Sequence, residues 1–185
     1  RVLRMDADTV SATNTHEKLL REFQEQQIPI LLGTQMVSKG LNFENVTLVG
    51  VLDADMSLYF GSYKATETTF SMITQVVGRA GRGAIGGRAL IQTMTPRNQV
   101  LELAAQQNYD AFFENELPLR RARGCPPYRD LLTVTFHGLD EQEVWHGAQD
   151  FHRMLQAQLS SPFYKTEQVS LLGPAPAAVA RVNYR

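Results

Sequence analysis

Short apolar runs alternate with helix-like segments through the first half of the chain, and this alternation limits the fold more than any other feature. The apolar runs are residues 2–5, 28–32, 46–52 and 88–93. Segments with the apolar spacing of helices lie between them, at residues 14–26 and 65–77. Continuous apolar strands separated by helices are typical of a parallel sheet with helices on both faces. The sequence therefore predicts an α/β fold, in which ligands bind at the carboxyl ends of the strands.

A second pattern begins after a basic segment, residues 120–129, that glycine and proline interrupt. Its arginines either contact a nucleic-acid backbone or are simply solvated. Apolar runs at 131–136 and 169–172 flank a helix that starts at Asp140. Strand, helix and strand in this order predict the opening of a small α+β domain that the chain does not complete. We therefore divide the chain into residues 1–124 and residues 125–185.

Composition sets outer limits on the function. The formal net charge is only −1, so any contact with nucleic acid must come from a local patch and not from a global positive field. The one cysteine, Cys125, excludes a disulfide framework and a zinc site built from this chain alone. No apolar run approaches the length of a membrane span, and no segment resembles a signal peptide. We expect a cytoplasmic protein, and strand-like sequence at both ends predicts that the chain is part of a longer one.

The most specific motif runs from Gln75 to Arg82, at the end of an apolar, helix-compatible segment. Arg79 and Arg82 stand three residues apart and each follows a glycine, so both lie on one face if the helix continues. The guanidinium group is a planar, permanently charged fork that fits phosphate oxygens. Gln75 is placed to orient a water molecule or a partner side chain. The spacing alone is equally compatible with a solvated helix end, where arginine and glycine are both common.

Polar residues also follow two of the predicted strands. After the run at 28–32, a glycine and Thr34 offer backbone N–H groups and a hydroxyl to a phosphate oxygen, and Ser38 and Lys39 come one turn later. An ordinary strand-to-helix turn capped by Thr34 is the alternative. After the run at 46–52, Asp53 and Asp55 either bind Mg²⁺ or hold an arginine of the later helix, and we favour the arginine.

Together these loops resemble the second RecA-like lobe of the DEAD/DEAH-type helicases, superfamily 2. Residues 33–42 are similar to their motif V, and residues 75–82 match the motif VI pattern Q-x-x-G-R-x-G-R in full. Five sequence segments also resemble the bacterial replication-restart helicases of the primosome. They are residues 34–40, 46–55, 74–82, 109–112 and 126–128. The resemblance covers essentially the whole chain. It implies the latter part of the second lobe followed by the start of a C-terminal domain.

This resemblance implies a part of an ATP-dependent 3′ to 5′ DNA helicase that acts in replication fork restart and primosome assembly. The implied cofactors are ATP and Mg²⁺, held mainly by a first lobe that is absent here, and zinc in an absent insertion. The fragment alone is expected to bind none of them and to be inactive. Implied partners are single-stranded and forked DNA, the single-stranded DNA-binding protein and primosome proteins, with no membrane. The implied location is the bacterial cytoplasm, in association with the nucleoid.

The resemblance also implies roles on the nucleotide side. Arg79 and Arg82 would contact the γ-phosphate of ATP bound on the other lobe, with Arg82 as the first choice for the arginine finger. Gln75 would help to place the attacking water. Gly40 would form the tight turn behind the phosphate site. Asn42 would reach the ribose, at a position where these helicases often carry aspartate.

On the DNA side, Thr34 would hold a phosphate of the tracking strand, with Ser38 and Lys39 beside it. Two alternative interpretations remain open. In the first, the chain is a lobe of another superfamily 2 motor such as RecG. In the second, it is a non-catalytic module that binds nucleic acid or a partner protein. A phosphate-binding P-loop upstream in the parent chain would separate a motor from such a module.

Overall fold

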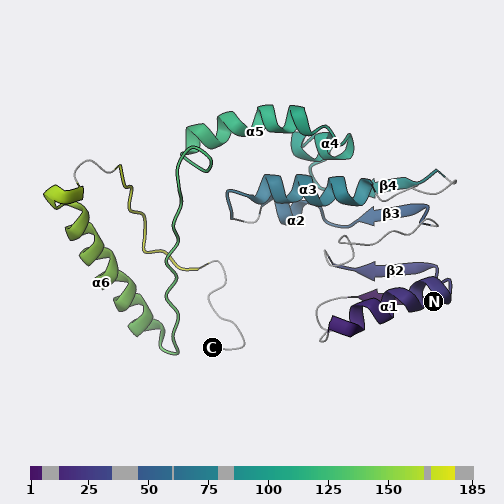
Figure 1. The fold of residues 1–185 in the computed structure, drawn as a ribbon, viewed down its shortest axis with the longest axis horizontal. Coiled ribbons are helices and arrows are strands. Elements are labelled where there is room, and N and C mark those ends of the chain that lie inside the picture. The colour runs from purple at the N-terminus through teal and green to yellow at the C-terminus, as the bar shows by residue number, and fades with distance from the viewer. Residues whose placement is uncertain (6–12, 35–45, 60, 79–85, 165–167, 178–185) are drawn as a thin grey trace. The chain divides into compact units, whose positions relative to one another are not determined.

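The computed structural model describes residues 1–5, 13–34, 46–59, 61–78, 86–164 and 168–177, with the backbone alone at 13–16. The contacts divide the chain into two compact units, Arg1–Tyr128 and Arg129–Arg185 (Figure 1). The domain boundary expected after residue 124 stays a prediction, because compactness alone does not define the limits of a domain. In the described part of the chain, every helix is too short or too polar to cross a membrane.

The chain opens with a β-α-β unit. Strand β1 (Val2–Met5) pairs in parallel with β2 (Ile30–Gly33), in a register that runs from Val2 opposite Ile30 to Met5 opposite Gly33. Helix α1 (Thr13–Glu25) lies between them in the sequence and contacts β1. Met5 and Ile28 are buried at this junction, with 0% and 4% of their surface exposed. This confirms the predicted strands and helix, with β2 beginning slightly later than expected.

A second parallel pair forms from β3 (Leu48–Val51) and β4 (Arg88–Ile91). The connection between them contains α2 (Asp55–Leu58) and α3 (Ala65–Val77), and α3 packs on both strands. The short helix α2 is not among the predicted elements, whereas α3 has the predicted bounds. Helices that connect parallel strands confirm the α/β fold.

The sheet differs from the prediction in two respects. Within the described residues, the strands form two separate two-stranded sheets, because no hydrogen-bond ladder joins β2 to β3. Burial also alternates along β3 and β4: Leu48 and Leu90 are 57% and 60% exposed, whereas Val51 and Ile91 are partly buried against α3. Side chains of a strand point to opposite faces in turn. Each of these strands is therefore covered on one face and not on both.

Two further helices complete the first unit. Helix α4 (Gln99–Ala105) begins at Asn98, whose side chain accepts a hydrogen bond from the Val100 amide, and α5 (Tyr109–Arg123) begins in the same way at Asn108. Gly124 ends α5 in the left-handed conformation, with φ 63°, which glycine adopts without strain. Together with α2 and α3, these helices enclose the buried core. Its members are Ala54, Leu58, Phe70, Ile73, Leu101, Ala104 and Phe112.

The second unit is built on one long helix, α6 (Glu141–Leu159), followed by a 3₁₀ turn at Pro162–Tyr164. The Asp140 carboxylate accepts hydrogen bonds from the Gln142 and Glu143 amides, so the predicted start of this helix is confirmed. The strands predicted at 131–136 and 169–172 are not formed. A strand needs the backbone groups of a neighbouring strand, and neither segment takes part in a hydrogen-bond ladder.

Candidate nucleotide and DNA site

Helix α3 places Gln75 on the surface. Thr69, Phe70 and Ile73 are buried on its inner face, at 0%, 3% and 0% exposure. Gln75 lies on the outer face and is exposed. Gly78 follows the helix with φ −66° and ψ −4°, and its amide donates to the Thr74 carbonyl oxygen at 3.0 Å. The backbone is therefore still helical at the residue directly before Arg79.

The turn between α4 and α5 approaches the end of α3 at Gly78. A Cβ atom on Gly78 would lie 3.2 Å from the Thr74 carbonyl oxygen and 3.5 Å from the side-chain nitrogen Nε2 of Gln107. Gln107 itself has a φ of 55°, which is uncommon for a residue other than glycine. The contact with Gln107 is an ordinary van der Waals contact to the end of a flexible side chain, and the tighter approach is to the Thr74 carbonyl oxygen of α3 itself.

Thr34 follows β2 at the carboxyl end of the first sheet and is exposed. Its amide donates to the Met5 carbonyl oxygen at 3.4 Å, so the amide continues the contact between β1 and β2. The expectation that this backbone N–H faces a phosphate is wrong, because the donor is already engaged. The hydroxyl is the group that Thr34 still offers to a ligand.

Asp55 is a structural anchor at the carboxyl ends of β3 and β4. Its Oδ1 accepts hydrogen bonds from the Thr93 hydroxyl at 2.9 Å and the Thr95 hydroxyl at 2.5 Å, and its Oδ2 accepts from the Met94 amide at 2.7 Å. The Thr95 hydroxyl, then the Met94 amide, lower the pKa of Asp55 below its ordinary value although burial acts the other way. Asp53 is exposed with a φ of 50°.

Arg79 and Arg82, the arginines of the later helix, lie outside the described residues, so the interpretation that these acids hold them stays a prediction. Within the described residues, Asp55 contacts no arginine. Its carboxylate instead ties the start of α2 to the turn after β4. Sequence reasoning missed this, because the donors are about forty residues away and become neighbours only through the parallel pairing of β3 and β4. Groups of three or more metal-binding side chains are likewise absent from the described residues.

Asp55→Asn is expected to lower the melting temperature at neutral pH, because an amide accepts more weakly than a carboxylate and also brings its own donors towards two hydroxyls. The folded state holds the pKa of Asp55 below its ordinary value. The stabilisation is therefore complete above the unfolded pKa of about 3.9 and is lost as the pH falls through the lower, folded pKa. Melting curves recorded down to about pH 2 should converge for variant and unmodified protein. A constant gap between them would contradict this role.

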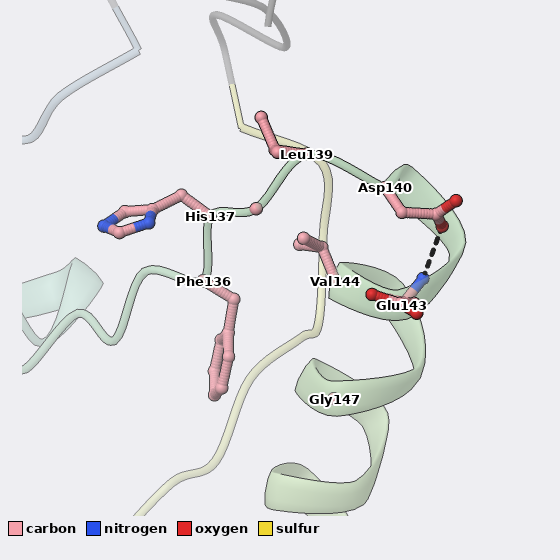
Figure 2. A pocket seen from close by; sticks show the side chains of 8 residues that line it. Phe136, His137, Leu139, Asp140, Glu143, Val144 and Gly147 are labelled. Atoms are coloured by element: carbon pink, nitrogen blue, oxygen red, sulfur yellow. Dashed lines mark hydrogen bonds between the residues drawn. The ribbon is translucent and has the colours of Figure 1, made fainter.

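A shallow hollow of about 260 Å³ lies in the second unit, beside the start of α6 (Figure 2). Phe136, His137, Leu139 and Val144 line it together with the cap of the helix. The Asp140 carboxylate accepts a hydrogen bond from the Glu143 amide at 2.9 Å, so this acid caps the start of α6. None of the predicted site residues lines this hollow, and we assign it no ligand.

The structure brings no two predicted site residues into contact among those it describes. Gln75 and Thr34 belong to different elements, and no hydrogen bond or ion pair joins them in the described part of the first unit. The other predicted site residues lie outside the described residues. They are Ser38, Lys39, Gly40, Asn42, Arg79 and Arg82.

Comparisons with known proteins cover both the motif region and the rest of the chain. Residues 1–84 match the helicase conserved C-terminal domain. The replication restart protein PriA of Bacillus subtilis (strain 168) is 40% identical over 185 residues, which is 100% of this chain and 22% of that protein. The PriA protein of Synechocystis sp. has the same identity and coverage. The PriA protein of Chlamydia pneumoniae is 38% identical over 161 residues, or 87% of this chain and 22% of that protein.

The chain thus spans about a fifth of the length of the curated relatives it matches. The similarity to them extends beyond the matched domain, through α4, α5 and the second unit. A whole-chain similarity of this kind agrees with the complete Q-x-x-G-R-x-G-R pattern at residues 75–82. The chain is therefore similar, along its whole length, to a segment of the replication restart protein PriA, and residues 1–84 match the helicase conserved C-terminal domain.

Proposed function

We propose that this chain is part of an ATP-dependent 3′ to 5′ DNA helicase that acts in replication restart and primosome assembly. The observation that carries the proposal is the 40% identity along all 185 residues to proteins named for replication restart. The complete motif at residues 75–82 supports it further, and it begins on α3, whose inner face packs in the core. The proposed location is the bacterial cytoplasm near the nucleoid.

In this proposal the chain responds to ATP bound against another lobe of the parent protein. Arg79 and Arg82 gain contacts with the γ-phosphate only when the two lobes close, so ATP favours the closed state. Gln75, exposed on α3, helps to place the attacking water. Closure shifts the Thr34 hydroxyl along the DNA backbone, and loss of the γ-phosphate after hydrolysis allows the lobes to reopen.

The described residues do not fit a resident Mg²⁺ or zinc ion. Asp55, one of the two acids that follow β3, already accepts three hydrogen bonds. The sequence contains one cysteine, whereas structural zinc sites take four ligands from cysteine and histidine. We therefore assign both metals to other parts of the parent protein, and ATP is a substrate that this chain contacts from one side.

The proposed partners are single-stranded and forked DNA, the single-stranded DNA-binding protein and other primosome proteins. The experiment that tests the function is ATP hydrolysis by the full-length parent protein, with and without single-stranded DNA, together with unwinding of a forked duplex. We expect DNA to stimulate hydrolysis and the fork to be unwound from a 3′ single strand, while the isolated 185-residue chain hydrolyses nothing. A parent protein without DNA-stimulated hydrolysis would favour a non-catalytic binding module instead.

Thr34→Val in the parent protein is expected to weaken single-stranded DNA binding about tenfold, since a hydrogen bond to a charged group contributes about 1.5–3 kcal/mol. Valine keeps the shape of threonine and removes the hydroxyl. Titration of a fluorescent single strand measures the affinity. Thr68→Val, which changes an exposed threonine near the start of α3, is the matched control. Equal affinities of both variants would remove Thr34 from the DNA site.

A further inference from the structure

Arg120, in the last turns of α5, joins three parts of the first unit. Its Nη2 donates to the Glu67 carboxylate at 2.7 Å, and its Nε donates to the Glu116 carboxylate at 3.0 Å. Its Nη1 donates to the Pro126 carbonyl oxygen at 3.4 Å. The guanidinium carbon also lies 5.6 Å from the centre of the Tyr63 ring. One side chain thus holds α3, α5 and the segment that follows α5.

The surroundings of Arg120 distinguish it from an ordinary surface ion pair. Its side chain and that of Glu116 are both only 13% exposed, whereas that of Glu67 is 50% exposed, and exposed pairs contribute little. The Thr66 hydroxyl donates to the same Glu116 oxygen at 2.9 Å, which adds a second tie between α3 and α5. Burial lowers the pKa of Arg120, but the hydrogen bonds to Glu116 and Glu67 outweigh it and raise that pKa. The guanidinium is therefore a fixed part of the packing.

Arg120 contacts the same helix, α3, on which the motif begins. Glu67 lies in the first turn of α3, and the same continuous helix carries Gln75 near its other end. A helix of this length moves largely as a rigid body because each turn is hydrogen-bonded to the next. The Pro126 carbonyl lies just before the second unit begins at Arg129. Arg120 therefore stands between the connection to the second unit and the helix that leads to Arg79.

We propose that Arg120 is a positioning residue of this motor, which sets α3 relative to α5 and to the connection that follows it. The proposal rests on the proposed function, and it deepens that function by naming a residue outside the motif that controls the motif's placement. Arg120 touches neither nucleotide nor DNA in this role. It acts through its contacts with Glu67 and Glu116.

The test compares Arg120→Gln with Arg121→Gln in the full-length parent protein. Arg121 is the neighbouring arginine, is exposed, and lies over the Tyr128 ring at 5.7 Å without an ion pair among the described residues. For Arg120→Gln we expect kcat with saturating single-stranded DNA to fall about tenfold or more, since a small misplacement far from the chemistry has effects of this order. The KM for ATP should stay unchanged. Arg121→Gln should match the unmodified protein.

Two further measurements separate positioning from loss of folding. Hydrogen exchange at the amides of residues 74–78 should become faster in Arg120→Gln, while the fraction folded at the assay temperature, measured by melting, stays the same.

Arg120→Lys should recover only part of the rate, because an ammonium group lacks the fork that reaches two carboxylates and a carbonyl. Glu67→Gln combined with Arg120→Gln should be no slower than Arg120→Gln alone, because the two act through one contact.

Full kcat in Arg120→Gln, or a loss that only follows the unfolded fraction, would overturn the positioning role. A parent protein that hydrolyses no ATP with DNA would overturn the proposed function instead. Hydrogen exchange still decides the positioning role in that case, because it needs no activity. Unchanged exchange at residues 74–78 would then count against it, and faster exchange would support it.

Discussion

Arg82→Ala in the full-length parent protein is expected to lower the rate of DNA-stimulated ATP hydrolysis about a thousandfold. Arg82 is the last residue of the complete Q-x-x-G-R-x-G-R pattern, and a guanidinium group there would neutralise charge that develops on the transferring phosphoryl group. Because this contact matters most in the transition state, kcat should fall far more than nucleotide affinity. Steady-state hydrolysis with saturating single-stranded DNA measures the effect.

The matched control for this variant is Arg97→Ala, which removes an exposed arginine outside the motif. It should leave the rate unchanged, which excludes a general effect of lost positive charge. Melting and nucleotide binding, measured on both variants, exclude unfolding and lost affinity. A rate for Arg82→Ala within a few fold of the control would remove Arg82 from catalysis and leave Arg79 as the remaining candidate for the finger.

Helices were predictable from the sequence where a cap or a regular apolar spacing marks them. Asp140 at the start of α6 and the apolar spacing of α3 both led to the observed elements, because capping and helical periodicity depend on residues close together in the chain. The parallel strands β1 to β4 were predictable for a related reason. Continuous apolar runs have few alternatives when helices separate them.

The wrong strand predictions at 131–136 and 169–172 have a different origin. Apolar, β-branched composition describes what a strand prefers, but a strand exists only when another backbone pairs with it. In the structure these segments remain largely exposed, with Leu132 at 91% and Leu172 at 87%. The residues of a segment do not show whether another strand will pair with it. A local sequence pattern therefore cannot correct this error.

The candidate site shows the same division between local and distant information. The motif at residues 75–82 is contiguous and was therefore found in the sequence. The partners of Asp55 were not found, because they lie about forty residues away in the chain, and neither was Glu67, the partner of Arg120 on α3, which lies about fifty residues away. Charged residues that look available to ligands in the sequence, such as Asp55 and Arg120, are engaged in holding the fold. Gln75 and Thr34 are exposed, and their roles stay predictions.

Phe112→Ala is expected to destabilise the first unit by about 3–5 kcal/mol, the usual cost when a buried phenylalanine is truncated and a cavity remains. Phe112 is 5% exposed, and its ring stacks on Phe70 of α3 with 4.2 Å between ring centres. Hydrogen exchange at the slowest amides of α3 and α5 measures the loss as a free energy. The effect should reach α3 because Phe70 loses its partner there.

Phe113→Ala is the matched control, since it removes the same ring from the next position of α5. Phe113 is 45% exposed and contacts Tyr109 with 6.0 Å between ring centres, so its loss should cost no more than about 1 kcal/mol. Equal losses for the two variants would contradict the core as described. A large loss confined to Phe112→Ala, together with faster exchange at the end of α3, would mean that the end of α3 depends on α5 through the stack of Phe112 on Phe70.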